Sequence, residues 1–175
     1  MDLRVGVAGA GAMGRNHARI YKLLDGVHLE GVYDVDYDRA EAVTAEFGGK
    51  AVSSLEALSE CCEAVSVTVP TDRHAAIGGQ LLRQGTHILV EKPIASSEEE
   101  AEKLVQLAVT TGKVLQVGHV DADRGHREHQ PGKRSNEGHE HRGHVLVCQR
   151  LVGRQGLQIA RNLLDLKGIV ALMSP

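Results

Sequence analysis

The stretch Gly9-Ala10-Gly11-Ala12-Met13-Gly14 decides the fold of this chain, because of what stands on either side of it. The apolar run Leu3–Ala8 before it predicts a short buried strand, and apolar residues recur at helical spacing over Arg15–Leu24 after it. A second apolar strand, Leu29–Tyr33, then ends at Asp34. This order of strand, glycine-rich turn, helix, strand and acid is the fingerprint of a dinucleotide-binding unit.

Each glycine of the turn has a physical task. Gly9 permits the tight turn, Gly11 lets the backbone approach a pyrophosphate, and Gly14 lets the helix pack close to the strand. Ala12 and Met13 stand where the helix begins, and a helix N-terminus offers free N–H groups and a positive dipole end to phosphates. We therefore expect these five residues to bind the cofactor.

Asp34 predicts which dinucleotide is bound. Its carboxylate would accept hydrogen bonds from the hydroxyls of the adenosine ribose, and it would repel a 2′-phosphate. The sequence therefore favours NAD over NADP as the cofactor.

Composition excludes several classes of partner. The chain has 175 residues, a net charge of −3 and 42% hydrophobic residues, so charge indicates no nucleic-acid partner. No apolar run approaches the ~20 residues that span a membrane, and we expect neither a membrane partner nor a signal peptide. The cysteines Cys61, Cys62 and Cys148 do not make a disulfide framework, which favours a reducing, cytoplasmic location.

Strands and helices alternate over residues 1–120. Beyond the first unit we expect helices over Asp38–Phe47, after Ser54, over His74–Gln84 and from Ser96 through Ala108, with strands at Ala51-Val52, Ala64–Val69, His87–Val90 and Val114–Val117. Ser54 and the pair Ser96-Ser97 are the expected N-caps of the helices that follow them. Repeated β-α-β units imply a parallel sheet covered on both faces. The predicted fold class is α/β, a doubly wound Rossmann sheet in an NAD-binding domain of residues 1–120.

This pattern stops at Asp121. Residues 121–143 are rich in His, Arg, Gly and Glu and show no period, and the excess of acidic over basic residues in 1–120 reverses in 121–175. We expect residues 121–175 to be an atypical tail, either a truncated remnant or a segment translated out of frame. His139-Glu140-His141 and His144 offer zinc ligand types, but their spacing fits no helix-borne motif, so no metal site is predicted.

Three motifs in order resemble the Gfo/Idh/MocA oxidoreductase family. They are Gly6–Gly14, the segment Val69-Pro70-Thr71-Asp72-Arg73-His74, and Glu91-Lys92-Pro93 after a strand. Within this family, residues 1–120 look most like the dehydrogenases that act on UDP-N-acetylglucosamine, with inositol dehydrogenases as close neighbours. The resemblance implies an NAD-dependent dehydrogenase of a sugar, sugar-nucleotide or inositol-type hydroxyl.

The resemblance also implies roles for single residues. Lys92 would be catalytic, holding the substrate hydroxyl and assisting proton movement, with Glu91 orienting it and the nicotinamide ribose. Pro70 and Thr71 would contact the cofactor. His74 would lie near the cofactor ribose or diphosphate, or else be a helix residue without a ligand; the sequence leaves both open.

The chain also departs from the family pattern. The Arg-Phe-Asn type segment that usually follows Gly-His is replaced by Asp121-Ala122-Asp123-Arg124, and the downstream Asp-x-x-x-His signature is absent. Members run to about twice this length, as two-domain chains do, and a substrate domain that also forms the homo-oligomer interface is expected to be missing. The alternative function is therefore a non-catalytic NAD-binding module or an inactive truncated remnant.

Overall fold

The computed structural model describes residues 2–118, and within them one parallel sheet carries the fold. Its strands are β1 (Leu3–Ala8), β2 (Val27–Tyr33), β3 (Lys50–Val52), β4 (Ala64–Val67), β5 (His87–Val90) and β6 (Leu115–Val117). They lie in the order β3-β2-β1-β4-β5-β6, the order typical of a dinucleotide-binding fold. The predicted α/β class with a Rossmann sheet is confirmed.

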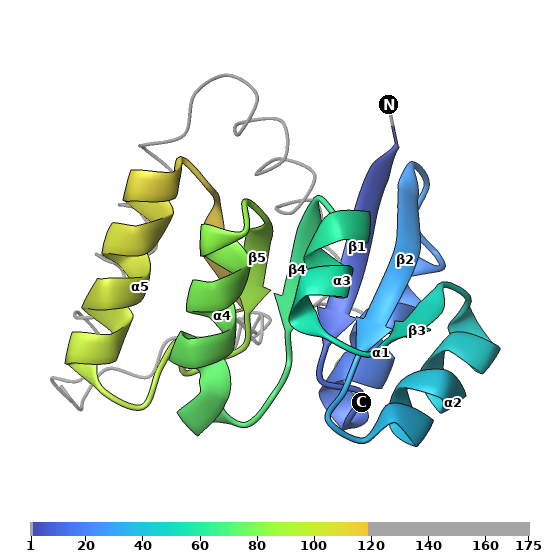
Figure 1. Ribbon diagram of the computed structural model, residues 1–175. Coiled ribbons are helices and arrows are strands. Elements are labelled where there is room, and N and C mark those ends of the chain that lie inside the picture. Colours follow the sequence, from blue (N-terminus) through green and yellow to red (C-terminus); the bar gives the residue numbers. More distant parts are fainter. Residues whose placement is uncertain (1, 119–175) are drawn as a thin grey trace, which may run out of the picture.

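Helices connect the strands and cover both faces of the sheet (Figure 1). They are α1 (Ala12–Tyr21), α2 (Tyr37–Phe47), α3 (Leu55–Cys61), α4 (His74–Arg83) and α5 (Glu98–Thr111), with a 3₁₀ turn η1 (Thr71–Arg73) before α4. Buried residues of α1 and α2 pack on one face. Those of α3, α4 and α5 pack on the other.

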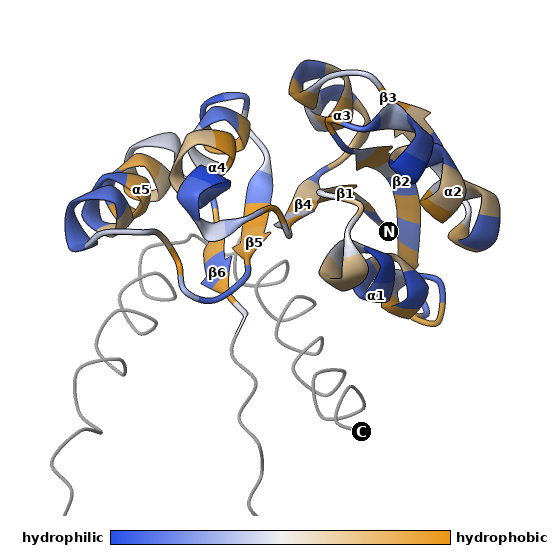
Figure 2. Cartoon of the chain, turned by 90° about the horizontal axis from the view of Figure 1, so that it is seen from below, coloured by the Kyte–Doolittle hydropathy of each residue, from blue (hydrophilic) through white to orange (hydrophobic). Residues whose placement is uncertain are grey.

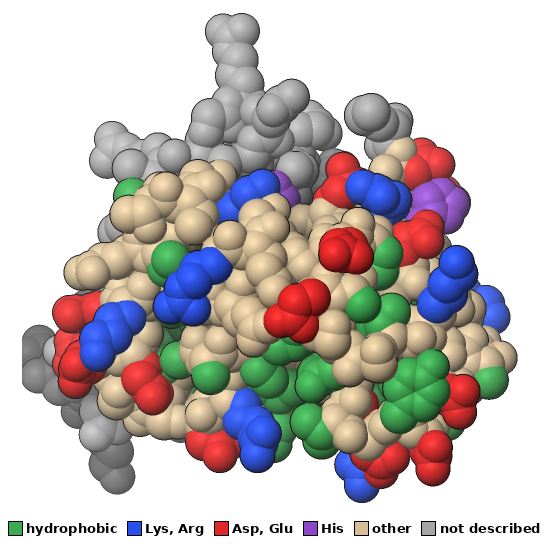
Figure 3. Space-filling model, in the orientation of Figure 1, with side chains coloured by type: hydrophobic (Ala, Val, Ile, Leu, Met, Phe, Trp, Pro, Cys, Tyr) green, Lys and Arg blue, Asp and Glu red, His purple; other side chains and the backbone are tan. Residues whose placement is uncertain are grey.

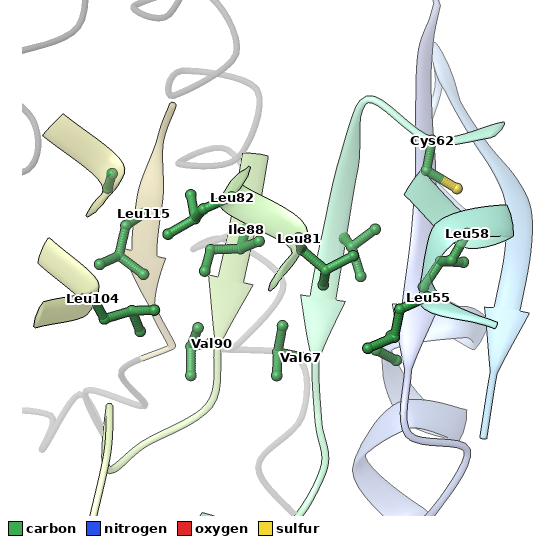
Figure 4. Packing of buried hydrophobic residues seen from close by; sticks show 13 residues of the cluster. Leu55, Leu58, Cys62, Val67, Leu81, Leu82, Ile88, Val90, Leu104 and Leu115 are labelled. Carbon is green, nitrogen blue, oxygen red and sulfur yellow. The ribbon is translucent and has the colours of Figure 1, made fainter. Parts of the chain in front are cut away.

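The core between the sheet and α3–α5 is apolar. Figure 4 shows the leucines of α3 and α4 lying against side chains of β4 and β5. Leu58, Leu81, Leu82, Ile88, Val67 and Val90 are each 0% exposed. The helices turn their hydrophobic sides inward and polar residues outward (Figure 2), so burial of these side chains is the main stabilising contribution on this face.

Local sequence signals explain where two helices begin. The Ser54 hydroxyl accepts a hydrogen bond from the Ala57 N–H at the start of α3, and the Ser97 hydroxyl accepts one from Glu100 at the start of α5. The expected caps are confirmed. Strand β4 ends at Val67, two residues earlier than expected. The Thr68 N–H still donates to the Ala8 carbonyl of β1, and the Thr68 hydroxyl donates to the carbonyl oxygens of Ala8 and Gly9.

The expectations for residues 121–175 lie outside the described residues. This applies to the histidine cluster and to the division of the chain at residue 120. Within residues 2–118, no helix is long and apolar enough to cross a membrane.

Candidate functional site

The glycine turn joins β1 to α1 at the carboxyl end of the sheet. Gly9 has a φ of +103°, and a Cβ there would lie 2.9 Å from the backbone of Thr68 and Val69. A Cβ at Gly14 would overlap the carbonyl oxygen of Gly9. Both positions therefore require glycine because of the protein's own packing.

Gly11 is different. A Cβ added there meets nothing within 4 Å, and its φ of −70° is open to any residue. Packing within the described chain therefore gives no reason for a glycine at this position. A ligand that approaches the backbone closely does give one, as the pyrophosphate of a dinucleotide would.

The N-terminus of α1 faces the same space. Gly11 is the N-cap residue and its carbonyl accepts the first helical bond, from Arg15 N–H at 2.9 Å. Ala12 and Met13 are exposed, and their N–H groups belong to the first turn, which has no intrahelical acceptors. These amides form a ready site for an anion.

Asp34 lies at the end of β2 and ties that strand to the turn. One carboxylate oxygen accepts a hydrogen bond from the Ala10 N–H at 2.6 Å, and the other accepts one from the Asp36 N–H at 2.9 Å. These bonds hold the carboxylate beside the glycine turn. The exposed side chains of Met13, Val35 and Tyr37 follow the ends of β1 and β2, and Figure 3 shows hydrophobic side chains gathered along this edge.

The loops after β4 and β5 reach the same edge of the sheet. Pro70 caps the 3₁₀ turn that contains Thr71, and the Lys92–Pro93 peptide bond is cis. His74 connects the two loops. Its ring nitrogens lie 2.8 Å from the carbonyl oxygen of Val69 and 2.9 Å from that of Pro93.

This geometry favours one of the two interpretations of His74. The residue is 1% exposed, and both ring nitrogens already face backbone carbonyls. The ring therefore has no nitrogen free for a ligand. Its place favours a structural contribution, holding the Val69 and Pro93 segments in register.

Glu91 and Lys92 follow β5 directly. Lys92 is exposed, and no carboxylate of residues 2–118 lies within 4.0 Å of its ammonium group. Glu91 is half-buried, and the hydrogen bond from His17 lowers the pKa of its carboxyl below the ordinary value. Glu91 is therefore ionised at neutral pH, beside a lysine whose ammonium is directed to solvent.

A polar network behind Glu91 was missed by sequence reasoning. The His17 ring bonds Glu91 Oε1 through Nε2 and the Ser66 hydroxyl through Nδ1, each at 2.9 Å. The Tyr21 hydroxyl lies 2.5 Å from the Ser66 hydroxyl. The sequence does carry one signal for two of its four members. His17 and Tyr21 are four residues apart and therefore share one face of α1.

Residues 2–118 contain no group of three His, Cys, Asp or Glu side chains arranged to hold a metal ion. The predicted site residues instead converge at one edge of the sheet, where the strands β1, β2, β4 and β5 end. Open α/β sheets bind their ligands at this edge.

A model of the Gfo/Idh/MocA oxidoreductases, described as an oxidoreductase family with an NAD-binding Rossmann fold, matches residues 3–119. The chain belongs to the Gfo/Idh/MocA family. The family is NAD-binding, and the expected resemblance is confirmed.

Among relatives, a UDP-N-acetylglucosamine 3-dehydrogenase from Acidithiobacillus ferrooxidans is 38% identical over 120 residues, covering 69% of this chain and 38% of the relative. A solved structure of that enzyme superimposes with a TM-score of 0.65 over 69% of this chain and 39% of the solved one. This Gfo/Idh/MocA chain thus spans less than half the length of the relative it matches.

Two other solved structures hold a cofactor. GenD2, from gentamicin A biosynthesis, is in complex with NAD; it is 31% identical, with a TM-score of 0.65 over 67% of this chain and 34% of its own. KijD10, a 3-ketoreductase from Actinomadura kijaniata, is in complex with NADP; it is 30% identical, with a TM-score of 0.62 over 67% of this chain and 37% of its own. Both cofactors therefore occur among the structural relatives.

Proposed function

We propose that this chain is the NAD-binding part of a dehydrogenase that oxidises a hydroxyl of a sugar, a sugar nucleotide or an inositol-type polyol. The observation that carries the cofactor assignment is the open space at Gly11. Of the three motif glycines, it is the one that packing does not require, so a ligand is the remaining physical reason for it.

In this proposal the glycine turn and the first turn of α1 hold the diphosphate. The N–H groups of Ala12 and Met13 donate to phosphate oxygens, and Gly9 and Gly14 keep the turn close to the strand. Asp34 accepts hydrogen bonds from the ribose hydroxyls, and its negative charge opposes a 2′-phosphate. Pro70 and Thr71, in the loop after β4, line the path toward the nicotinamide.

Lys92 is the proposed catalytic residue. When bound, NAD would supply the hydride acceptor, which is chemistry of the cofactor. The neutral amine of Lys92 would accept a hydrogen bond from the reacting hydroxyl and take up the proton that leaves its oxygen. Glu91 accepts from the backbone N–H of Lys92 and from the His17 ring and so keeps Lys92 at the end of β5.

The relatives' names support the substrate class. The sequence, however, lacks part of the motif set that catalysis by this chain alone would need. No Asp-x-x-x-His signature is present to supply a histidine and a substrate-binding acid. We therefore expect the 175-residue chain alone to bind NAD(H) weakly and to oxidise sugar nucleotides at no appreciable rate. A non-catalytic NAD-binding module in residues 1–120, followed by an atypical tail, is the second candidate.

The free thiols of Cys61 and Cys62 support a reducing, cytoplasmic location.

Fluorescence titration of the chain with NADH and NADPH tests the cofactor assignment. Gly11→Val is expected to lower the free energy of unfolding by no more than about 1 kcal/mol, because the position is open and only a favourable N-cap residue is lost, and to weaken NADH binding at least tenfold. Gly14→Ala is the control that should lose both stability and binding, because its Cβ overlaps Gly9. Wild-type NADH affinity in Gly11→Val would contradict the assignment.

Turnover tests whether the 175-residue chain is sufficient for catalysis. NAD reduction in the presence of UDP-N-acetylglucosamine is measured with the wild type, with Lys92→Ala, and with Lys103→Ala as an exposed lysine outside the site. Binding without turnover in all three is the expected result. Turnover that Lys92→Ala alone abolishes would contradict it and establish a self-sufficient enzyme.

A further inference from the structure

A hydrogen-bonded network joins the side chains of Tyr21, Ser66, His17 and Glu91. It contains so few polar hydrogens that the donor and acceptor of each bond can be assigned. Tyr21 and Ser66 are 2% and 0% exposed, and each hydroxyl carries one hydrogen. The side chains of His17 and Glu91 are 11% and 18% exposed. Burial matters here because a buried donor without a partner loses its hydrogen bonds to water and gains none in return.

The bond to Glu91 fixes one end of the network. An ionised carboxylate only accepts, so His17 must carry a hydrogen on Nε2 to bond Glu91 Oε1 at 2.9 Å. The open question is then whether His17 Nδ1 carries a second hydrogen.

The buried hydroxyls answer it. If Nδ1 carried a hydrogen, three hydrogens would share two contacts, His17 Nδ1 with Ser66 and Ser66 with Tyr21, and one of the two hydroxyl hydrogens would have no acceptor among residues 2–118. If Nδ1 carries no hydrogen, Tyr21 donates to Ser66, Ser66 donates to Nδ1, and every group is paired.

We propose that His17 is a positioning residue for the Glu91–Lys92 pair, held by Tyr21 and Ser66 as the neutral Nε2–H tautomer that donates to Glu91. The inference deepens the proposed function, because Lys92 is the residue to which it assigns the chemistry. Its structural core, the direction of the hydrogen bonds, stands without that function.

The network does not carry protons to water. It ends at Tyr21, where burial raises the pKa of the phenol to about 12, so the phenol keeps its hydrogen at neutral pH. Because Tyr21 always donates at the buried end, the direction of every hydrogen bond from Tyr21 to Glu91 is fixed. The consequence is that His17 sets the position and charge of Glu91 and takes no part in exchanging the substrate proton.

Glu91 is confined from the opposite side as well. A Cβ added at Gly118 would lie 3.2 Å from Glu91 Oε1, tighter than ordinary contact, and the Gly118 N–H donates to the Val90 carbonyl at 2.7 Å. The carboxylate thus lies between the His17 ring and the backbone that follows β6. This confinement restricts the Glu91 carboxylate to one position. Lys92 is the next residue in the chain, so its backbone is held with Glu91.

Nitrogen-15 NMR of the full chain at pH 7, without cofactor, tests the direction of the bonds. The expected spectrum has His17 Nε2 protonated and Nδ1 unprotonated and accepting. Ser66→Ala should change the Nδ1 shift and allow Nδ1 to carry a hydrogen as well, because nothing then donates to Nδ1. An imidazolium or an Nδ1–H tautomer in the wild type overturns the proposal.

Carbon-13 titration of the Glu91 carboxyl tests the positioning. His17→Leu is expected to move the Glu91 pKa back up toward its ordinary value, because the largest cause of its lowering is lost. His17→Gln, whose amide can donate in place of Nε2, should keep most of the lowering. Equal titration in the wild type and His17→Leu overturns the positioning role.

NADH titration of the same variants separates this proposal from the proposed function. We expect about tenfold weaker binding in His17→Leu and near wild-type binding in His17→Gln. The matched control is His28→Leu, which removes an exposed histidine bonded to Asp2 at 2.9 Å and should leave NADH affinity unchanged. If the wild type binds no NADH, the proposed function fails while the two NMR readouts still decide the network.

Discussion

Strand β4 shows how the two faces of the sheet differ. Val65 and Val67 point into the core beneath α3 and α4, where the described neighbours are apolar. Ser66, between them, points to the α1 side, where it is 0% exposed and bonded to His17 and Tyr21. At β4 the α3–α5 face is therefore held by burial of apolar surface, whereas the α1 face also holds paired polar groups.

The difference has a functional consequence. Apolar packing is non-directional. It fixes how far the helices lie from the sheet, but the rotation of each side chain is limited only by the shape of its neighbours. Hydrogen bonds between Ser66, His17 and Glu91 are directional, so they fix the orientation of a charged group at the sheet edge. The polar face is the one that lies behind the proposed active site.

The largest expected effect is on the apolar face. Leu81→Ala removes a side chain that is 0% exposed and should lower the free energy of unfolding by about 2–5 kcal/mol, measured by urea denaturation. Leu23→Ala, at a position 72% exposed, is the control and should change little. A small effect of Leu81→Ala would mean that this face is not the main source of stability.

The polar face should give the chain a pH-dependent stability. His87 accepts a hydrogen bond from the Val114 N–H, and burial lowers the pKa of its ring to about 4. Because the folded value lies below the unfolded one, this stability is present above pH 6.5 and is lost as the pH falls toward 4, about 1–3 kcal/mol over the window once screening by solvent is included. Urea denaturation at several pH values measures it.

His87→Asn is the matched variant for that measurement. Its side-chain carbonyl can accept from Val114 in place of Nδ1, and it does not titrate. The loss of stability between pH 6.5 and 4 should flatten in this variant. The same slope in both proteins would assign the pH dependence to other groups.

A smaller effect should come from breaking one link of the buried network. Ser66→Ala leaves the Tyr21 hydroxyl and His17 Nδ1 without their partner and should destabilise the fold by about 1–3 kcal/mol. Adding Tyr21→Phe to Ser66→Ala should cost less than the sum of the two single changes, because the orphaned hydroxyl is gone. Additive free energies of unfolding would argue against a coupled network.

The smallest effect should be at an exposed helix end on the apolar side. Ser97→Ala removes the hydroxyl that accepts from the Glu100 N–H and should cost about 1 kcal/mol, and Ser97→Gly should cost a few tenths. Thermal or urea unfolding measures both. A loss as large as that of Leu81→Ala would mean that capping, and not the buried leucines, dominates this face.

Local patterns predicted much of the fold. The glycine turn, the alternation of elements and the Ser54 and Ser97 caps involve residues a few positions apart, and the described chain has them. The turn η1 and the early end of β4 were not predicted. Beside them, the Thr68 hydroxyl donates to the carbonyl of Gly9, 59 residues away, a contact that no local pattern indicates.

The candidate site divides in the same way. Gly11 and Asp34 are marked by their place in a motif, and the structure puts both at the carboxyl edge of the sheet. The motif could not show that His74 turns both ring nitrogens to backbone carbonyls, since one of these acceptors is 19 residues away. Nor could it show that His17 bonds Glu91, which is 74 residues along the chain.

The sequence by itself determined the fold class, the family and the edge of the sheet that holds the motifs, because strand and helix periods, turn glycines and caps act over short distances. The tertiary structure decided which side chains meet across that edge. Parallel strands bring distant segments into register, and only then does Ser66 face α1 and does His17 reach Glu91. Hydrogen bonds require positions within about 3 Å, and those positions exist only in the folded chain.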